Sequence, residues 1–193
     1  MSGADNRKDA TLLTPQEREG LISPHVTLAR ELNEAEQANI LVAATWVFAR
    51  KRDVFDESFL RGLHRRMFDK VWRWAGEFRT TPSDVGVAPS MIAPELERVI
   101  AEAKGWASHS TYMPDEIAVR YHHALVWVHP FPNGNARWSR LVGDATAVAL
   151  GRVPFSWGRK TIHGLGEARS AYLDALRAAD RHDFAPLIRF SRS

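Results

Sequence analysis

The sequence has no cysteine among its 193 residues. This absence excludes disulfide bonds, thiolate nucleophiles and cysteine-based zinc or iron–sulfur sites, so any chemistry must use His, Asp, Glu, Arg or hydroxyl groups. Long apolar runs are also missing, since no stretch approaches the roughly 18 consecutive apolar residues of a membrane span. The polar, charged start MSGADNRKDATLL also lacks the apolar run of a signal peptide. We therefore expect a cytoplasmic protein that has no membrane partner.

A strong excess of charge of either sign is likewise lacking. The 26 basic and 23 acidic side chains give a formal net charge of +3, and no polybasic block is present. Nucleic acid binding is therefore permitted but not indicated. The length and the 45% hydrophobic content suffice for one sizeable core and leave little room for a second. We expect one domain over residues 27–193, preceded by an N-terminal arm over residues 1–26 that is a candidate regulatory segment.

What the sequence does contain is helical periodicity. Apolar residues recur every three to four positions, and Asp56, Pro114 and Gly151 stand where helices begin or end. The pattern predicts helices over residues 27–48, 57–72, 94–105, 114–129, 135–151, 168–179 and 184–189. Residues 78–87 (FRTTPSDVGV) instead place β-branched residues around a Pro-Ser-Asp turn, which is typical of a short β-hairpin. The predicted fold class is an all-α bundle with one short hairpin.

The strongest chemical signal is the loop between the fourth and fifth predicted helices. The fifth helix would begin at Asn135, a candidate N-cap, and its first turn would present unpaired N–H groups at the positive end of the helix dipole. Gly134 lets a phosphate approach this backbone closely. Arg137 and Arg140 are three residues apart, so both guanidinium groups can reach the same polyphosphate. The segment therefore predicts a phosphate-binding site.

His129 lies at the mouth of the same loop. An imidazole can accept a proton near neutral pH, so His129 is placed to activate a hydroxyl nucleophile beside a bound phosphate. The alternative is a helix-terminal histidine that bonds a backbone carbonyl. The two neighbouring arginines favour the catalytic interpretation.

This segment resembles the signature of the Fic (Fido) family, His-x-Phe-x-(Asp/Glu)-Gly-Asn-Gly-Arg-x-x-Arg. The matching residues are His129, Phe131, Gly134, Asn135, Arg137 and Arg140. The stretch from Trp74 to Thr81 is similar to the family's Trp-Ala-Gly segment, and the flap that positions the target would include Thr80, Thr81, Gly86 and Val87. The blocks that begin at Leu13, Glu19 and Glu31 look most like the branch called mobile mystery protein B.

The resemblance implies a Fic-type helical bundle with protein adenylyltransferase (AMPylase) activity. His129 would deprotonate a hydroxyl of the target protein, which attacks the α-phosphate of ATP and expels pyrophosphate. Asn135 and Arg137 would hold phosphates, Arg140 would grip the γ-phosphate, and the backbone from Phe131 to Asn135 would stabilise the developing charge. The branch further implies a small helix-turn-helix or antitoxin-like partner.

Two residues depart from the signature. Asn133 stands where the family usually has the Asp or Glu that holds Mg²⁺, so its neutral carbonyl should bind the metal more weakly. Ala136 replaces the second motif glycine, and its methyl group would crowd the phosphate-binding turn. We expect slow turnover. Two alternatives stay open, namely a nucleotide-binding module without catalysis and the transfer of another phosphate-containing group.

Further candidates carry weaker signals. Many members of the family are inhibited by a glutamate in a Ser/Thr-x-x-x-Glu-Gly/Asn motif, and Glu19 matches only the end of it, because Pro15 stands at the Ser/Thr position. Glu19 is therefore a candidate inhibitory residue, with an ordinary surface role as the alternative. His122 lies seven residues before His129, which raises a metal-hydrolase alternative. No carboxylate stands beside these histidines at a spacing typical of metal ligands. Tyr172 is a candidate for stacking on adenine or for the core.

Overall fold

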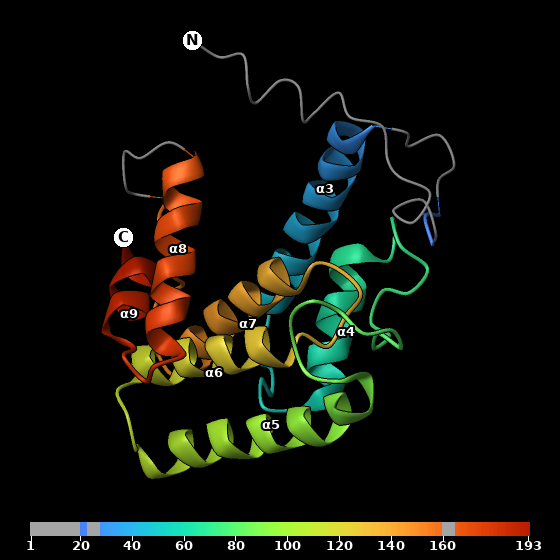
Figure 1. The fold of residues 1–193 in the computed structure, drawn as a ribbon. Coiled ribbons are helices and arrows are strands. Elements are labelled where there is room, and N and C mark those ends of the chain that lie inside the picture. Colours follow the sequence, from blue (N-terminus) through green and yellow to red (C-terminus); the bar gives the residue numbers. More distant parts are fainter. Residues whose placement is uncertain (1–19, 23–27, 160–164) are drawn as a thin grey trace.

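A computed structural model of the protein describes residues 20–22, 28–159 and 165–193. Within these ranges the chain forms seven α-helices and one 3₁₀ turn and no regular strand, which confirms the all-α prediction (Figure 1). The elements are α3 (Ala29–Phe48), α4 (Glu57–Phe68), η1 (Pro89–Met91), α5 (Ile92–His109), α6 (Pro114–Val128), α7 (Asn135–Ala149), α8 (Leu165–Ala179) and α9 (Ala185–Arg192). None of the described helices is long and apolar enough to cross a membrane.

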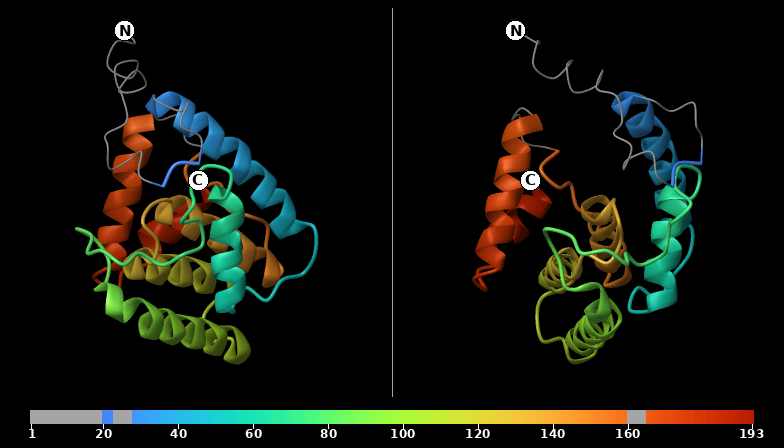
Figure 2. Two further views of the ribbon diagram at one scale, coloured as in Figure 1. Left: turned by 90° about the vertical axis from the view of Figure 1, so that its right-hand side faces the viewer. Right: turned by 45° about the vertical axis from the view of Figure 1, so that its right-hand side comes forward.

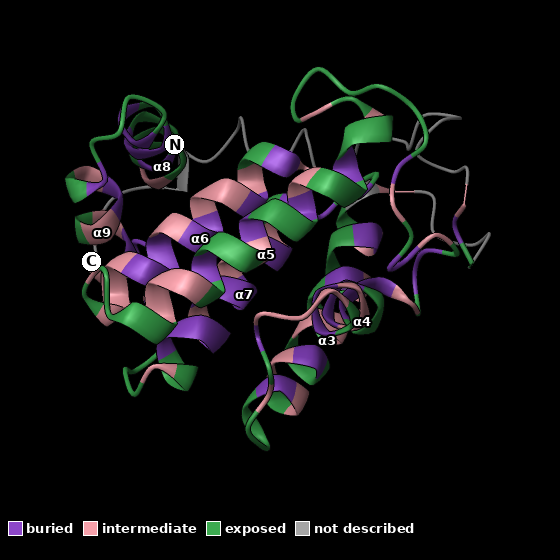
Figure 3. Ribbon diagram, turned by 90° about the horizontal axis from the view of Figure 1, so that it is seen from below, coloured by how far each residue is buried: buried purple, intermediate pink, exposed green. Residues whose placement is uncertain are grey.

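The central layer consists of α6 and α7, which lie side by side. The α3–α4 pair and the α8–α9 pair stand on opposite sides of this layer, and α5 packs against α6 (Figure 2). Buried residues are dense on α4, α6 and α7 and sparse on α5 (Figure 3). One hydrophobic core fills the space among α3, α4, α5, α6 and α7, and a smaller one joins α6 and α7 to α8 and α9. The loop between α6 and α7 thus joins the two helices of the central layer, both of which are well buried.

Local signals explain most helix boundaries. The Asp56 carboxylate accepts a hydrogen bond from the Phe59 N–H at 2.9 Å and so caps α4, as predicted. The prediction that Asn135 caps α7 is wrong by one residue. Gly134 is the N-cap, with φ +78°, and Asn135 is the first helical residue. The reason is that the Asn135 side chain turns back to the preceding loop instead of covering the helix end.

The β-hairpin predicted over residues 78–87 is not formed. The only isolated bridge between two described residues joins Leu21 to Trp72. The backbone N–H groups of the two limbs of residues 78–87 donate to the chain around the α6–α7 connection and form no ladder with each other. The Arg79 N–H donates to the Pro130 carbonyl at 2.9 Å, and the Val87 N–H donates to the Val128 carbonyl at 3.4 Å. Because these backbone groups have partners elsewhere, no ladder closes, and we call residues 78–87 the flap.

Candidate catalytic loop and phosphate pocket

His129 follows the last residue of α6 in a left-handed conformation, with φ 52° and ψ 58°. Its N–H still donates to the Leu125 carbonyl at 3.2 Å, so its half-buried ring stands at the entrance to the loop. A non-glycine residue in this region costs about 1 kcal/mol or more, which the surroundings must supply. Burial, with a smaller contribution from the positive charge of Arg79, holds the pKa of His129 below its usual value. The imidazole is therefore neutral near pH 7 and able to accept a proton.

The loop of residues 129–135, here the motif loop, is closed by Asn135. Its amide nitrogen donates to the Phe131 carbonyl at 2.7 Å, and its amide oxygen accepts from the Phe131 N–H at 3.0 Å. The side chain is only 2% exposed, so both ends of the amide are satisfied inside the protein. The resemblance to the family signature implies that Asn135 holds a phosphate. The side chain is occupied in the loop, which leaves its backbone N–H for that contact.

His64 is a second anchor of the motif loop, and sequence analysis gave it no role. Its ring is fully buried and stacks on Phe131, with ring centroids 3.7 Å apart. Nδ1 accepts from the Gly76 N–H, and Nε2 donates to the Asn133 carbonyl, both at 3.0 Å. These partners fix one tautomer, and burial lowers the pKa of His64 to about 3. The sequence signal that could have indicated this role is that His64 lies on the apolar face of α4.

The first turn of α7 presents free backbone donors. Gly134 has φ +78°, and a Cβ there would lie 2.5 Å from the Phe68 ring, so the turn requires glycine. The N–H groups of Asn135 and Ala136 donate to no acceptor within the described ranges. Ala136 is exposed, so its methyl group lies on the surface that a phosphate would approach. Donors at a helix N-terminus are the arrangement that binds phosphate.

The two motif arginines have different surroundings. Arg137 donates at 2.6 Å to Glu36, a carboxylate on α3 that is only 2% exposed and also accepts from the Trp72 indole at 2.7 Å. Arg140 donates to the Ala136 carbonyl at 3.1 Å, lies over the Tyr172 ring, and pairs with no described carboxylate. The positive charge of Arg137 is therefore compensated, whereas that of Arg140 is available to an anion.

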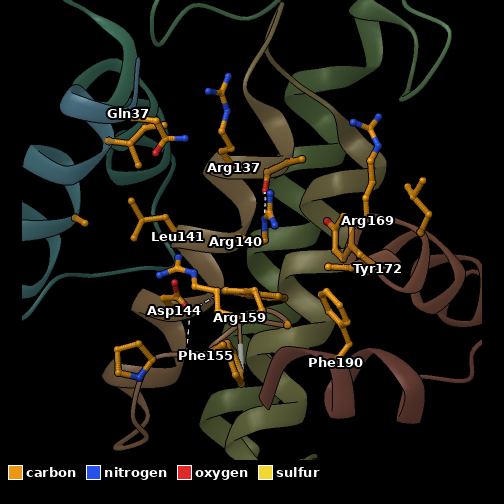
Figure 4. Close-up of a pocket in the computed structure, with 18 of the residues that line it drawn as sticks. Gln37, Arg137, Arg140, Leu141, Asp144, Phe155, Arg159, Arg169, Tyr172 and Phe190 are labelled. Atoms are coloured by element: carbon orange, nitrogen blue, oxygen red, sulfur yellow. Dashed lines mark hydrogen bonds between the residues drawn. The ribbon is translucent and has the colours of Figure 1, made fainter. Parts of the chain in front are cut away.

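A cavity of about 930 Å³ opens beside Arg140, between α3, α7, residues 154–159 and α8 (Figure 4). Its volume suits a ligand of nucleotide size. Arg159 and Arg169 line it with Arg140, and none of the three forms an ion pair with a described acid. Asp144 is the one carboxylate among the lining residues that the structure describes, and burial raises its pKa to about 6. Its Oδ1 accepts from the Phe155 N–H and the Trp157 indole. We call this cavity the cationic pocket.

The remaining predicted residues fall in three places. Asn133 is exposed, and its side-chain oxygen accepts from the Gly134 N–H at 2.6 Å. No group of three or more His, Asp or Glu that could hold a metal ion occurs among the described residues. In the flap, Thr80, Thr81 and Gly86 are exposed and Val87 is half-buried. Glu19 lies outside the described residues.

The metal-hydrolase alternative finds no support in the surroundings of His122. The ring is fully buried, its Nε2 lies 3.2 Å from the Tyr172 hydroxyl, and it packs on Trp157. Burial lowers the pKa of His122 to about 3. His122 is therefore a core residue. Tyr172 is a core residue whose hydroxyl faces His122, and its ring also lines the cationic pocket, so stacking on adenine stays a prediction.

Comparison with known proteins identifies relatives of this arrangement. The sequence model described as the Fic/DOC family matches residues 54–147. A protein adenylyltransferase Fic of Culex quinquefasciatus is 31% identical over 144 residues, which are 72% of this chain and 27% of that protein. The protein adenylyltransferase fic-1 of Caenorhabditis briggsae is 32% identical over 138 residues, 66% of this chain and 25% of that protein. The chain thus spans about a quarter of the length of these curated relatives.

Solved structures show the same fold. Fic-1 (aa134–508) from C. elegans has a TM-score of 0.67 at 24% identity and covers 89% of this chain and 50% of that one. The BepC protein of Bartonella tribocorum, with bound AMPPNP, has a TM-score of 0.66 at 19% identity and covers 91% of this chain and 95% of that one. At these identities the likeness is one of fold alone.

Proposed function

We propose that this chain, whose residues 54–147 match the Fic/DOC family model, is a protein adenylyltransferase, which moves AMP from ATP to a hydroxyl side chain of a target protein. One observation carries the proposal. A neutral His129 stands at one end of the motif loop, and the free N–H groups of Asn135 and Ala136 stand at the other. A base and an anion site only a few residues apart are what transfer to a hydroxyl needs.

In the proposed reaction His129 accepts the proton of the target hydroxyl. The hydroxyl oxygen forms a bond to the α-phosphorus of ATP, the bond from that phosphorus to the β-phosphate oxygen breaks, and pyrophosphate leaves. The N–H groups of Asn135 and Ala136 stabilise the charge that develops on the α-phosphate; one such donor is worth about 100-fold in rate or more. Arg140, whose charge has no described acidic partner, binds the terminal phosphates, and Arg137 supports it from its fixed position on Glu36.

Mg²⁺ is part of the proposal, with Asn133 as its ligand from the protein. The donor set fits weakly, since Asn133 offers one neutral oxygen that already accepts from the Gly134 N–H. Magnesium commonly takes several of its oxygen ligands from substrate phosphates and water, so a single amide oxygen is compatible with binding of the ATP complex. The bound ion would neutralise charge on the phosphates.

The target protein would lie along the flap, against Thr80, Thr81, Gly86 and Val87. Three of these residues are exposed, and Gly86 packs directly on His129, so a segment bound there is adjacent to the base. We further propose that residues 27–193 form the catalytic domain and residues 1–26 a regulatory arm, with membership in the mobile mystery protein B branch and a small helix-turn-helix or antitoxin-like partner. The support is the set of N-terminal blocks, beginning at Leu13, Glu19 and Glu31, that resemble this branch.

The test is incubation of the chain with a cell lysate, Mg²⁺ and ATP labelled at either the α- or the γ-phosphate. The proposal predicts α-label on protein, lost in His129→Ala and retained in His109→Ala, a control histidine exposed on α5. Label from the γ-phosphate would mean phosphorylation and would contradict AMP transfer. ATP binding without any transferred label would identify a nucleotide-binding module, the alternative that Asn133 and Ala136 favour.

A further inference from the structure

Arg79 is a buried cation without an acidic partner. Its side chain is 5% exposed, and no described carboxylate lies within ion-pair distance. Removing a guanidinium group from water is unfavourable unless its N–H groups find acceptors, and buried arginines usually pair with acids. An arginine buried in this way therefore needs a specific set of acceptors to account for it.

The acceptors are three backbone carbonyls from separate segments. Nε donates to the His129 carbonyl at 2.8 Å, and Nη1 donates to the Thr81 carbonyl at 3.1 Å. Nη2 donates to the Val87 carbonyl. Thr81 and Val87 belong to opposite limbs of the flap, so one planar guanidinium group joins both limbs to the residue that carries the proposed base. The donors of an arginine are spread over three nitrogens of a rigid plane, whereas the three donors of a lysine share one nitrogen and cannot span the same three carbonyls.

The surrounding backbone supports the same junction. The Arg79 N–H donates to the Pro130 carbonyl, directly after His129, and the Val87 N–H donates to the Val128 carbonyl, directly before it. Gly86 has φ +91°, and a Cβ at this position would lie 2.4 Å from the His129 Cβ and 3.0 Å from Nη2 of Arg79. The flap therefore touches His129 on its side chain and on both neighbouring peptides. This contact set accounts for the left-handed conformation of His129.

We propose that Arg79 is a positioning residue that holds His129 and both limbs of the flap as one unit. The proposal rests on the proposed AMP transfer, because it assigns to Arg79 the alignment of base and target. Arg79 touches neither ATP nor the reacting atoms. It fixes the peptide of His129 through the carbonyl, and it fixes the flap, along which the target would lie, through Thr81 and Val87.

The positive charge of Arg79 also favours the neutral form of His129. Its guanidinium group contributes, after burial, to the lowered pKa of His129. No described acid offsets it at this point, since Glu36 is engaged with Arg137 and Trp72, and Asp84 is an exposed residue of the flap. A base that stays neutral and cannot rotate away is suited to accepting the hydroxyl proton.

The test compares Arg79→Gln and Arg79→Lys with Arg73→Gln, an exposed arginine six residues earlier. The rate of α-label transfer and the Kd for ATP are measured for each variant. Arg79→Gln should lower the rate at least about 30-fold with a Kd for ATP within about 3-fold of the original, because the anion site is on α7. Arg79→Lys should recover only a small part of the rate, since it keeps the charge without the fork.

Arg73→Gln should leave both values unchanged. Equal rates for the original chain and Arg79→Gln, or full recovery by lysine, would overturn the proposal.

A second measurement needs no activity. Amide hydrogen exchange in the ligand-free protein should become at least about 10-fold faster at residue 79 and at Val87 in Arg79→Gln, with the Trp138 amide of α7 unchanged as a control for folding. Unchanged exchange at both flap positions would refute the positioning role. If the flap responds in this way while the original chain transfers no AMP, the positioning role stands and the proposed function fails. If Arg79→Gln does not fold, the same exchange comparison with Arg79→Lys decides.

Discussion

The motif loop and the cationic pocket lie at the two sides of the first turn of α7, and they treat polar groups in opposite ways. In the loop, Asn135 and His64 satisfy the backbone from buried positions, and Arg79 fixes the carbonyl of His129. In the pocket, three guanidinium groups have no acidic partner within the described chain. The part that would hold the base is anchored before any ligand arrives, whereas these three arginines of the part that would hold phosphates are not tied up in ion pairs with described acids.

The difference follows from what each region would do. Alignment of a base with a hydroxyl loses about 100-fold in rate for a misplacement of roughly 1 Å, so loop contacts must be complete in the free protein. A phosphate site needs the opposite, because a cation already paired with a carboxylate must first give up that pair. Arg137 lines the cationic pocket beside Arg140, but its charge is already paired with Glu36.

The largest expected effect comes from breaking the loop at Asn135. Asn135→Ala removes two buried hydrogen bonds and leaves both polar backbone groups of Phe131 without partners, each at a cost of about 1–3 kcal/mol. We expect at least a 100-fold loss of α-label transfer, on the order of the misplacement penalty. Urea unfolding measures the stability, and Asn33→Ala, at an exposed position of α3, is the control. A transfer rate equal to that of the control would show that the loop does not depend on this side chain.

Acid should destabilise the protein through its buried histidines. His64 and His122 have pKa values of about 3 in the folded chain, against 6.5 for an unperturbed histidine. The unfolded state therefore binds more protons below pH 6.5, so stability falls as pH falls, by about 2 kcal/mol per histidine between about pH 7 and about pH 5. His122→Phe should remove about half of this loss in urea unfolding. A pH dependence identical to that of the original chain would contradict the assignment, and His109→Phe is the exposed control.

Substitutions in the cationic pocket should change the affinity for ATP instead of the rate of transfer. Arg140→Gln removes a charged donor facing the pocket, so we expect ATP to bind about 10-fold more weakly. Arg159→Gln, at an exposed and solvent-screened position, should weaken binding only about 3-fold. Isothermal titration calorimetry with ATP measures both, with Arg177→Gln on the exposed face of α8 as control. If the Kd of Arg140→Gln matched that of Arg177→Gln, the terminal phosphates would not lie in this pocket.

The smallest expected effect is a gain in the rate of transfer when Asn133 is substituted. Asn133→Asp supplies the carboxylate that Mg²⁺ prefers and leaves the His64 anchor in place, because His64 contacts the backbone carbonyl of Asn133 and not its side chain. We expect a rate of α-label transfer about 3-fold higher and a steeper dependence on Mg²⁺ concentration. Asn33→Asp controls for the added charge. An unchanged or lower rate would contradict the metal assignment of this position.

The sequence predicted what depends on neighbouring residues. The apolar spacing predicted the seven helices that the structure describes. The local pattern of Gly134, Arg137 and Arg140 indicated a phosphate site, which stays a prediction. The contacts that distinguish loop from pocket join residues far apart in the chain. His64 is 69 positions from Asn133, and Glu36 is 101 positions from Arg137. The flap shows the same limit, since its β-branched residues suit a hairpin while its backbone partners lie in the α6–α7 connection.

The central claim is that the motif loop is formed before the nucleotide binds, whereas the phosphate site is completed by it. Amide hydrogen exchange at Phe131 and Ala136, measured with and without ATP, tests this directly. The Phe131 amide, bonded to Asn135, should be protected in the free protein and little changed by ATP, while the free amide of Ala136 should exchange rapidly and slow at least about 10-fold on binding. Rapid exchange at Phe131 that slows only when ATP is present would contradict the claim, because the loop would then form on binding.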